Sequence, residues 1–382
     1  MKRFWLALLL LMACAALRAQ EHIVARIVDA KTGSPLPFAS VYVNGANSTI
    51  SNADGEFLVD VAPHDTLRFT YVGYKTLWLK ASEVGVTVKM QVDDKTLGEV
   101  TVMGTELIVE NVMKRLKKEF RKHKKEQCNL FYRQLTYSDN RCCSFLESFF
   151  SGLSSVQLRD LSLVTGRYVF AANSMTSNPL NFYTFAQVPI YSTKRWFEYD
   201  EQMVPLHSRY NKTFKMKSQA VSDGERIVYR VDFQPIDTTC WSMKGSFYVD
   251  ASTFELLKFE GVGQRDIVKH TVKGISWVLP LDYSFVVTYI DDNDFTEVGS
   301  VYFQTHFSLN DVEYDTTGIM YNVGERFFKG HDKLGFKNNL LWSIKKQGLD
   351  PDFWRDNEIV KRTPIEEEAL ELFERDNLFG VY

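Results

Sequence analysis

His123 and Glu126 have the spacing of two ligands of a catalytic zinc ion, in the pattern His-x-x-Glu. Such a site needs a third protein ligand and surroundings that attract a divalent cation. The pair instead ends a run of lysines and arginines, whose positive charge opposes cation binding, and no other histidine or cysteine set has a ligand spacing. The sequence therefore predicts neither structural nor catalytic zinc.

The segment Asn52-Ala53-Asp54-Gly55-Glu56 carries oxygen-bearing side chains at alternate positions, as calcium-binding loops do. Alignment with such a loop places Ile50 at the first ligand position and Val61 at the last, and neither side chain has an oxygen. The segment is better explained as a turn, in which Asn52 accepts hydrogen bonds through its side chain and Gly55 adopts a positive φ.

Other signals of catalysis do not occur in the sequence, which has no His-Glu-x-x-His pair, no Gly-x-Ser-x-Gly elbow, no phosphate loop and no dinucleotide fingerprint. The formal net charge of −3 provides no broad attraction to nucleic acid. We therefore predict no catalytic residue, no cofactor-binding residue and no metal ligand, and a protein that is not an enzyme. A hydrolase with dispersed catalytic carboxylates is an alternative.

The first nineteen residues predict a secretory signal. Lys2 and Arg3 precede an apolar run, Phe4–Ala16, which is too short to span a membrane, and Ala19 is a suitable residue before the cleavage site. Cleavage before Gln20 would remove three basic residues and leave a net charge of −6. We expect a periplasmic or outer-membrane-associated protein whose mature chain has no transmembrane helix. Acylation of Cys14, as in a lipoprotein, is the less favoured alternative.

Four cysteines follow the predicted signal: Cys128, Cys142, Cys143 and Cys240. In an oxidising compartment one disulfide is possible, between Cys240 and either member of the adjacent pair. Buried free thiols are an equally good explanation, because spacing alone does not assign a bridge.

Residues 20–103 contain repeated strand-turn-strand patterns. Apolar residues alternate before Asn44-Gly45 and again after Asp54-Gly55. The order of turns and apolar anchors resembles the carboxypeptidase regulatory-like domain of exported Bacteroidetes-type proteins, and it is carried by Asp29, Gly33, Pro35-Leu36-Pro37, Asp54-Gly55-Glu56-Phe57 and Tyr71-Val72-Gly73-Tyr74. The resemblance implies a prealbumin-like β-sandwich that is not itself a peptidase and accompanies enzymes, receptors and uncharacterised proteins alike.

We expect this sandwich to have seven strands and to fold independently, with Phe57, Leu67, Phe69 and Tyr71 in or near its core. Gly33 and Gly55 are expected at positive φ, where a β-branched residue costs about 1 kcal/mol or more.

A linker region, 104–126, is expected after the sandwich and a short strand at Lys95–Gly104. Apolar residues at helical spacing in Glu106–Glu126 predict an amphipathic helix with a basic exposed side. That side could dock on anionic lipid or on an acidic partner. A solvated helix that packs its narrow apolar stripe on the next domain is the favoured explanation.

The region 127–382 is predicted to be β-rich, with strand after strand from Cys128 to about Leu309 and a helix at Glu366–Arg375. Trp241, Met243, Phe247 and Val249 alternate onto one side of a strand. The closing segment resembles that of two-part envelope proteins that begin with the regulatory-like domain and have no established activity.

The phrase GSFYVDASTFELLKFEG, Gly245–Gly261, resembles a hairpin of periplasmic lipoprotein-carrier-like half-barrels. That resemblance implies a curved antiparallel sheet that wraps a helix and leaves an apolar concavity; an ordinary hairpin explains the phrase as well. We expect an open, curved sheet of at least six strands over 128–308, with the 106–126 helix or the C-terminal helix packed against it. A flat sandwich and a membrane barrel remain alternatives.

The predicted fold class is therefore mostly β, a small N-terminal β-sandwich followed by a larger antiparallel β domain with a few helices. The predicted function is a non-catalytic binding or scaffolding role in the cell envelope, with a lipid, a peptide or an envelope protein as the ligand. A small outer-membrane β-barrel is a further alternative.

Overall fold

The chain forms two compact units: Met1–Val92 with Ile359–Thr363, and Asp93–Glu358 with Pro364–Tyr382. The computed structural model describes residues 21–71, 73–93, 103–139, 141–170, 180–192, 204–223, 226–238, 242–264, 281–290, 295–309, 311–324, 328–334, 339–357, 360–375 and 379–381. The predicted signal segment, residues 95–102 of the strand predicted at Lys95–Gly104, Cys240 and Trp241 lie outside these ranges. Among the described helices, none has both the length and the apolar character that crossing a bilayer requires.

The first unit is a sandwich of two sheets with strand orders β4-β1-β7 and β3-β2-β5-β6. Its seven strands, the number predicted, are β1 Glu21–Asp29, β2 Ser40–Val43, β3 Ala46–Ile50, β4 Glu56–Val61, β5 Thr66–Thr70, β6 Leu77–Lys80 and β7 Thr87–Met90, with a short 3-10 helix, η1 Ala81–Glu83, after β6. Phe57, Leu67 and Phe69 are fully buried between the sheets, and Tyr71 packs at the margin of this core. The predicted core is confirmed.

The motif residues of this unit have structural roles. Asp29 is buried and accepts hydrogen bonds from the backbone of Lys31 and Thr32 and from the Tyr74 hydroxyl, at 2.8 Å. These bonds, led by the one from the Thr32 backbone, lower the pKa of Asp29 to about 2. Gly33 and Gly55 have the expected positive φ, 72° and 77°. At Gly55 a Cβ would also lie 2.5 Å from the Ile27 carbonyl oxygen. Both the positive φ and this close contact therefore disfavour larger residues at Gly55.

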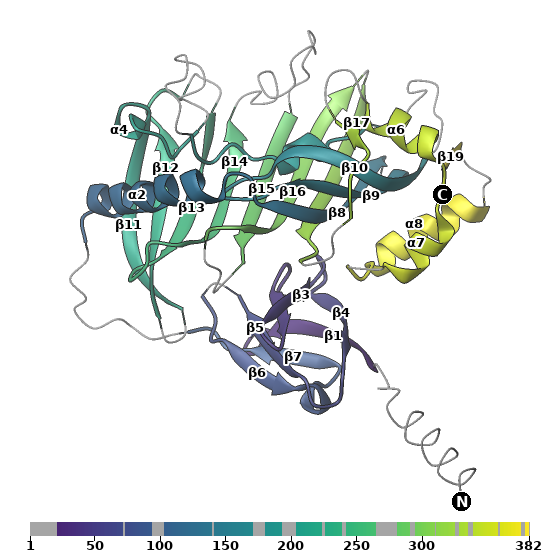
Figure 1. Ribbon diagram of the computed structural model, residues 1–382, viewed down its shortest axis with the longest axis horizontal. Coiled ribbons are helices and arrows are strands. Elements are labelled where there is room, and N and C mark those ends of the chain that lie inside the picture. The colour runs from purple at the N-terminus through teal and green to yellow at the C-terminus, as the bar shows by residue number, and fades with distance from the viewer. Residues whose placement is uncertain are drawn as a thin grey trace, which may run out of the picture. The chain divides into compact units, whose positions relative to one another are not determined.

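The second unit is built on a twelve-stranded sheet, ordered β11-β12-β13-β14-β15-β16-β17-β8-β9-β10-β18, with β19 also paired to β10 (Figure 1). Its pairings are all antiparallel. The strands are β8 Gln127–Ser138, β9 Arg141–Leu153, β10 Arg159–Phe170, β11 Phe214–Asp223, β12 Arg226–Pro235, β13 Ser242–Asp250, β14 Leu256–Gln264, β15 Leu281–Tyr289, β16 Val298–Leu309, β17 Val312–Asn322, β18 Asp332–Lys333 and β19 Phe379–Val381.

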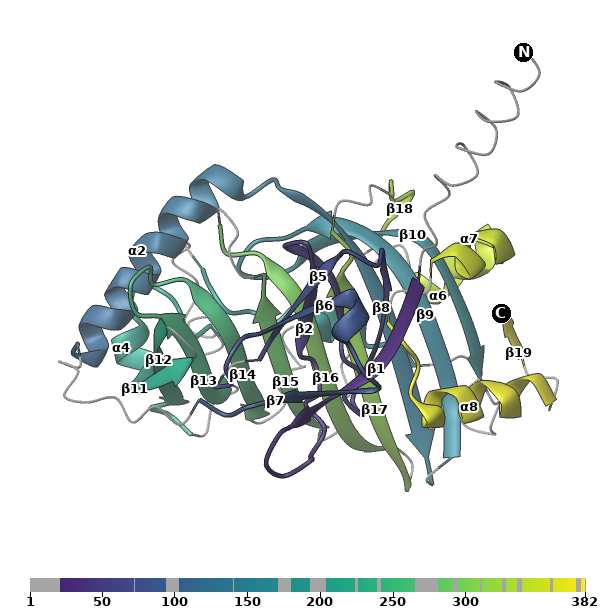
Figure 2. The same ribbon diagram turned by 90° about the horizontal axis from the view of Figure 1, so that it is seen from below.

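This sheet curves, and helix α2, Thr105–His123, lies on its concave face (Figure 2). The helix buries Ile108, Val109, Val112 and Leu116 in one apolar cluster with residues of the sheet. Met243, Phe247 and Val249 of β13 belong to the same cluster and are fully buried. The expectations of a curved sheet, of a helix packed on it and of an inward-facing side on β13 are confirmed.

Three further helices follow β18 and surround β10. Helix α6, Leu340–Gln347, is capped by the Asn339 side chain and packs Ile344 against the concave side. Helix α7, Pro351–Asp356, begins after the cap Asp350. Helix α8, Pro364–Arg375, buries Leu370 on the convex face against Leu135, Phe145 and Val169. Both faces of the sheet are thus covered around β8–β10.

The prediction of uninterrupted strands from Cys128 to Leu309 is wrong between β10 and β11. The described residues there form a 3-10 helix, η2 Tyr183–Ala186, a single helical turn, α4 Tyr210–Thr213, and irregular segments. The aromatic residues of 180–192 have the composition of a strand, but they pack onto the sheet instead of extending it.

Candidate ligand-binding face

The candidate zinc pair does not form an open site. His123 Nδ1 lies 3.2 Å from Glu126 Oε1, so the two side chains contact each other. The His123 ring also stacks on Phe295, with ring centroids 4.4 Å apart. In the ranges that the structure describes, no group of three or more histidine, cysteine, aspartate or glutamate side chains converges as metal ligands would.

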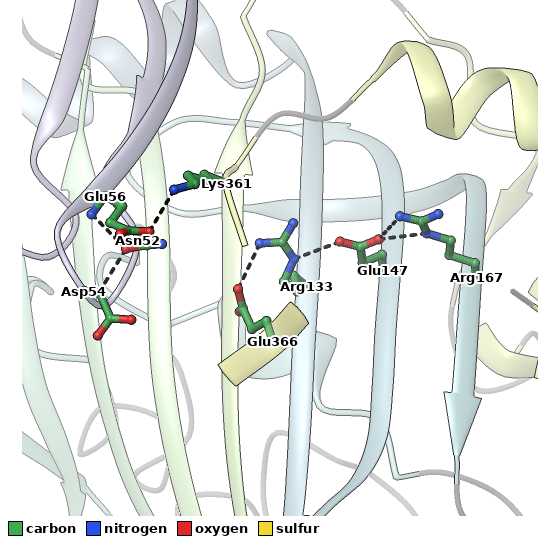
Figure 3. Close-up of polar contacts among 8 residues, drawn as sticks. All are labelled: Asn52, Asp54, Glu56, Arg133, Glu147, Arg167, Lys361 and Glu366. Carbon is green, nitrogen blue, oxygen red and sulfur yellow. Dashed lines mark hydrogen bonds and ion pairs between the residues drawn. The ribbon is translucent and has the colours of Figure 1, made fainter. Parts of the chain in front are cut away.

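The Asn52–Glu56 segment is the turn that its sequence suggests. Asn52 Oδ1 accepts hydrogen bonds from the backbone nitrogens of Asp54 and Glu56, at 3.0 and 2.9 Å. The Glu56 carboxylate contacts Lys361 Nζ at 3.0 Å, within the same compact unit (Figure 3). The side-chain oxygens of Asn52 and Glu56 are therefore engaged by the protein.

The described cysteines are free thiols. Cys142 and Cys143 donate weak hydrogen bonds to the backbone oxygens of Ser144 and Thr136. Burial raises the pKa of Cys142 to about 12 and that of Cys143 to about 11, which keeps both protonated and poorly nucleophilic. With Cys142 and Cys143 as free thiols, the structure does not contain the predicted bridge to Cys240, and Cys240 itself lies outside the described residues.

The concave face of the large sheet carries a row of aromatic rings that crosses neighbouring strands. Phe247 of β13 stacks on Phe259 of β14, with ring centroids 5.9 Å apart. Phe259 stacks in turn on Phe285 of β15, at 6.0 Å. Tyr283 and Phe303 continue the row onto β16. This row makes a wide surface suited to apolar contacts.

Residues 180–192, which we call the plug segment, occupy part of this concave face. Phe185 of the plug segment packs against Tyr283 and Phe303, with ring centroids 5.1 and 5.7 Å away. Phe182 packs against Phe307 at 5.6 Å. Apart from an isolated bridge at Tyr191, the described backbone of the plug segment pairs with no strand. It therefore fills an apolar concavity without joining the sheet.

Neutral polar side chains hold the plug segment in place. The Gln134 side chain donates to the Leu180 carbonyl oxygen and accepts from the Phe182 backbone nitrogen, at 2.9 and 2.8 Å. The Tyr283 hydroxyl donates to the Phe185 carbonyl oxygen at 2.7 Å. The Gln157 side chain accepts from two further backbone nitrogens of the segment. Two side-chain amides and one hydroxyl thus hydrogen-bond to backbone groups of the plug segment, as the side chains of a peptide-binding site would.

Burial keeps the hydroxyls of this face neutral. It raises the pKa values of Tyr132, Tyr283 and Tyr289 well above the usual value of 10. At physiological pH these groups are hydrogen-bond donors and not bases. The concave face therefore offers apolar contacts and neutral hydrogen bonds.

The convex face carries an ionic network beneath the C-terminal helices (Figure 3). Glu147 of β9 is 1% exposed and receives Arg133 Nε on one carboxylate oxygen and Arg167 Nε on the other, both at 2.8 Å. Arg133 also contacts Glu366 of α8 at 3.4 Å, and Arg167 lies over the Trp354 ring at 4.2 Å. Because both oxygens of Glu147 are engaged by guanidinium groups, it is not placed to act as a catalytic base.

A polar cavity of about 350 Å³ lies among β10, β18, α6 and the residues that follow α6. Its lining includes His331, Asp332, Lys346 and Asp350. Asp350 already caps α7 by accepting from the Phe353 backbone nitrogen. Among its described lining residues there is no phenylalanine, tyrosine or tryptophan, unlike on the concave face.

Comparison with known proteins identifies the first unit. Residues 25–102 match the family model of the CarboxypepD_reg-like domain. The N-terminal module belongs to this family. The match spans less than half of the chain. A search of curated proteins found no match to this chain.

Two solved structures are similar to larger parts of the chain. A LolA superfamily protein, NE2245 from Nitrosomonas europaea, is 12% identical over 58% of this chain and 94% of its own, with a TM-score of 0.24. MucB, solved in complex with MucA(peri), is 9% identical over 59% of this chain and 100% of its own, with a TM-score of 0.17. At these scores neither structure carries an argument about ligand or partner.

Sequence reasoning missed both the plug segment and the ionic network. The aromatic residues of the plug segment have the composition of a strand, and the members of the network are far apart in the chain. Pro189 and Asn181 are the sequence signal that distinguishes the plug segment from a strand, because both residue types are unfavourable in a central strand.

Proposed function

We propose that the protein is an exported, non-catalytic binding protein of the cell envelope, whose concave face takes an apolar ligand in the place of the plug segment. The observation that carries this proposal is the position of Phe185, an aromatic side chain of an irregular segment that packs between rings of the sheet. A segment without strand pairing is a more replaceable occupant than a strand or a long helix.

The location rests on two features. The first nineteen residues have the pattern of a secretory signal. The N-terminal module matches the CarboxypepD_reg-like domain, and its motifs resemble those of exported proteins. Cell fractionation with an antibody against the protein tests this part of the proposal. Recovery in the cytoplasmic fraction would contradict it.

The ligand class follows from the lining of the face. Aromatic rings favour an acyl chain or an apolar peptide over a polar metabolite. Gln134 holds amide groups of the plug segment, so a ligand with a carbonyl or amide group would reuse these hydrogen bonds.

Binding of two probes to the purified mature protein tests the ligand class. One probe is a fluorescent fatty acid, and the other is a labelled peptide with the sequence of residues 180–191, LNFYTFAQVPIY. Tyr283→Phe removes one bond that holds the plug segment, so we expect the fatty acid, which does not depend on that bond, to bind about fivefold tighter. The peptide would lose the same bond as the plug segment, so we expect its affinity to stay about the same.

Tyr289→Phe is the matched control, because Tyr289 is equally buried and its hydroxyl donates to the Val156 carbonyl oxygen outside the plug segment. We expect this control to leave probe affinity unchanged. If neither probe binds the wild-type protein or Tyr283→Phe, the concave face is only a structural core and the proposal fails. Equal effects of the two variants would also contradict it.

A further inference from the structure

The solvent-exposed side of α2 carries a cluster of positively charged side chains. Six exposed basic residues occupy the end of the helix and the turn that follows it, and we call them the basic cluster: Lys117, Lys118, Arg121, Lys122, Lys124 and Lys125. In the part of the chain that the structure describes, none of the six takes part in an ion pair. The protein as a whole is mildly acidic, so this local excess of positive charge is not an overall property.

The acidic residues near the basic cluster are already committed elsewhere. Glu119 pairs with Arg115, which also contacts Glu255 of the second unit. Glu126 contacts His123. The Arg159 side chain donates to the Lys124 carbonyl oxygen at 3.0 Å and brings one more positive charge to the helix end. The helix dipole accounts for a few cations in the last turn, but not for two residues a turn earlier, Lys117 and Lys118.

We propose that the basic cluster docks the protein on a membrane surface rich in anionic phospholipid. Clusters of four to eight lysine and arginine residues on an amphipathic helix suit anionic headgroups. The composition of the cluster favours lipid over an acidic protein, because protein interfaces are poor in lysine and depend on buried aromatic or apolar anchors. The exposed large apolar residue of α2 is Leu107, which lies at the other end of the helix.

The burial of α2 determines how it would bind. Its apolar stripe is inside the core of the second unit and cannot enter a bilayer while that unit is folded. The stripe consists of Ile108, Val109, Val112 and Leu116. The interaction is therefore electrostatic, without insertion of the helix. Such binding weakens steeply with salt, because the lysines contact headgroups through solvent-exposed charges.

Co-sedimentation of the purified mature protein with lipid vesicles tests the proposal. One set of vesicles is phosphatidylcholine alone, and the other contains phosphatidylglycerol at about a third of the lipid. We expect binding to the anionic vesicles at low ionic strength, release in 0.5 M NaCl and little binding to phosphatidylcholine. Replacing Lys117, Lys118 and Lys122 together by Gln should weaken binding about a hundredfold, because each cation contributes roughly fivefold.

The matched control replaces three other exposed lysines of the same unit, Lys212, Lys215 and Lys217, by Gln. This control has the same net charge as the test variant but an intact basic cluster, and we expect it to bind almost as the wild type does. Equal losses in the two variants would show a general charge effect and overturn the proposal. Absence of binding to anionic vesicles, or binding that survives 0.5 M NaCl and does not depend on lipid charge, would overturn it as well.

Discussion

The two faces of strands β8 and β9 are both covered, but by opposite means. On β9, Leu146 and Phe150 enter the apolar core of the concave face, where the plug segment and α2 pack. Between them on the chain, Glu147 points to the convex face and binds two arginines under the C-terminal helices. A side-chain period of two thus separates an apolar face from an ionic one on a single strand.

The plug segment on the concave face and the ionic network on the convex face differ in how strictly they depend on particular partners. Apolar contacts are not directional, so under the proposed function another apolar molecule of suitable size takes the place of the plug segment. The ionic network has fixed partners, and a substitute that lacks any one of them leaves a buried charge unpaired. We therefore regard the convex face as the fixed side of the sheet and the concave face as the side that can receive a ligand.

Removal of Glu147 should have the largest effect. Glu147→Leu leaves Arg133, which is 2% exposed, without its buried carboxylate partner, and we expect a loss of about 3–5 kcal/mol in the free energy of unfolding. Urea denaturation followed by circular dichroism measures it. Glu313→Leu, at an exposed position of β17, is the control and should change stability by less than about 0.5 kcal/mol. Similar values for the two variants would mean that the network does not hold the convex face.

A methyl group added to the concave face should have the next largest effect. In Gly318→Ala the new Cβ would lie 2.3 Å from the Phe303 ring, so we expect overpacking to cost about 1–3 kcal/mol. Gly299→Ala is the control, because its Cβ would be in ordinary contact at 3.4 Å. A tolerated Gly318→Ala would show that the concave face is loosely packed, and this would strengthen the case for an exchangeable occupant.

Alkaline pH should weaken the concave face selectively. Because burial raises the pKa of Tyr283 in the folded state, the unfolded chain releases that proton first, from about pH 10 upward. The unfolded state then binds fewer protons than the folded state, so stability falls as pH rises, by about 1.4 kcal/mol per pH unit for each such tyrosine. Between pH 9 and 11 the Tyr283→Phe variant should lose about 1.4 kcal/mol less stability than the wild type, because the full slope is reached only above about pH 11. An unchanged slope would mean that water reaches this hydroxyl.

The outermost member of the ionic network should matter least. The Glu366 side chain is 15% exposed, and its contact with Arg133 is long, at 3.4 Å. Arg133 keeps Glu147 when Glu366 is changed, so Glu366→Gln should cost no more than about 1 kcal/mol in unfolding experiments. A loss as large as that of Glu147→Leu would show that the network acts as one unit.

The fold could be predicted wherever alternation and turn residues agree. The first unit follows its turns, including those at Gly33 and Gly55, and the β13–β14 hairpin follows Met243, Phe247 and Val249. These signals are local, because a strand and its hairpin partner are close in the chain. The packing of α2 was also visible in its apolar stripe.

The coverings of the sheet could not be predicted from the same signals. Alternation places Arg133 and Glu147 on a polar face, which is solvent-exposed by default, and only the return of residues 351–375 buries it. The plug segment has no period of its own, and its position depends on Gln134 and Tyr283, which come from strands far apart in the sequence. Long-range burial of this kind leaves no local trace.

The return of Ile359–Thr363 to the first unit also orders events in time. All seven strands of that unit precede the large sheet in the chain, whereas Lys361, the partner of Glu56, comes near its end. During synthesis the sandwich can therefore assemble long before this last piece exists, since domains fold as they emerge. The ion pair between Lys361 and Glu56 forms only once strands β8 to β18 have been made, with β19 of the large sheet still to follow. Its presence in the first unit therefore reports that the chain has been completed to that point.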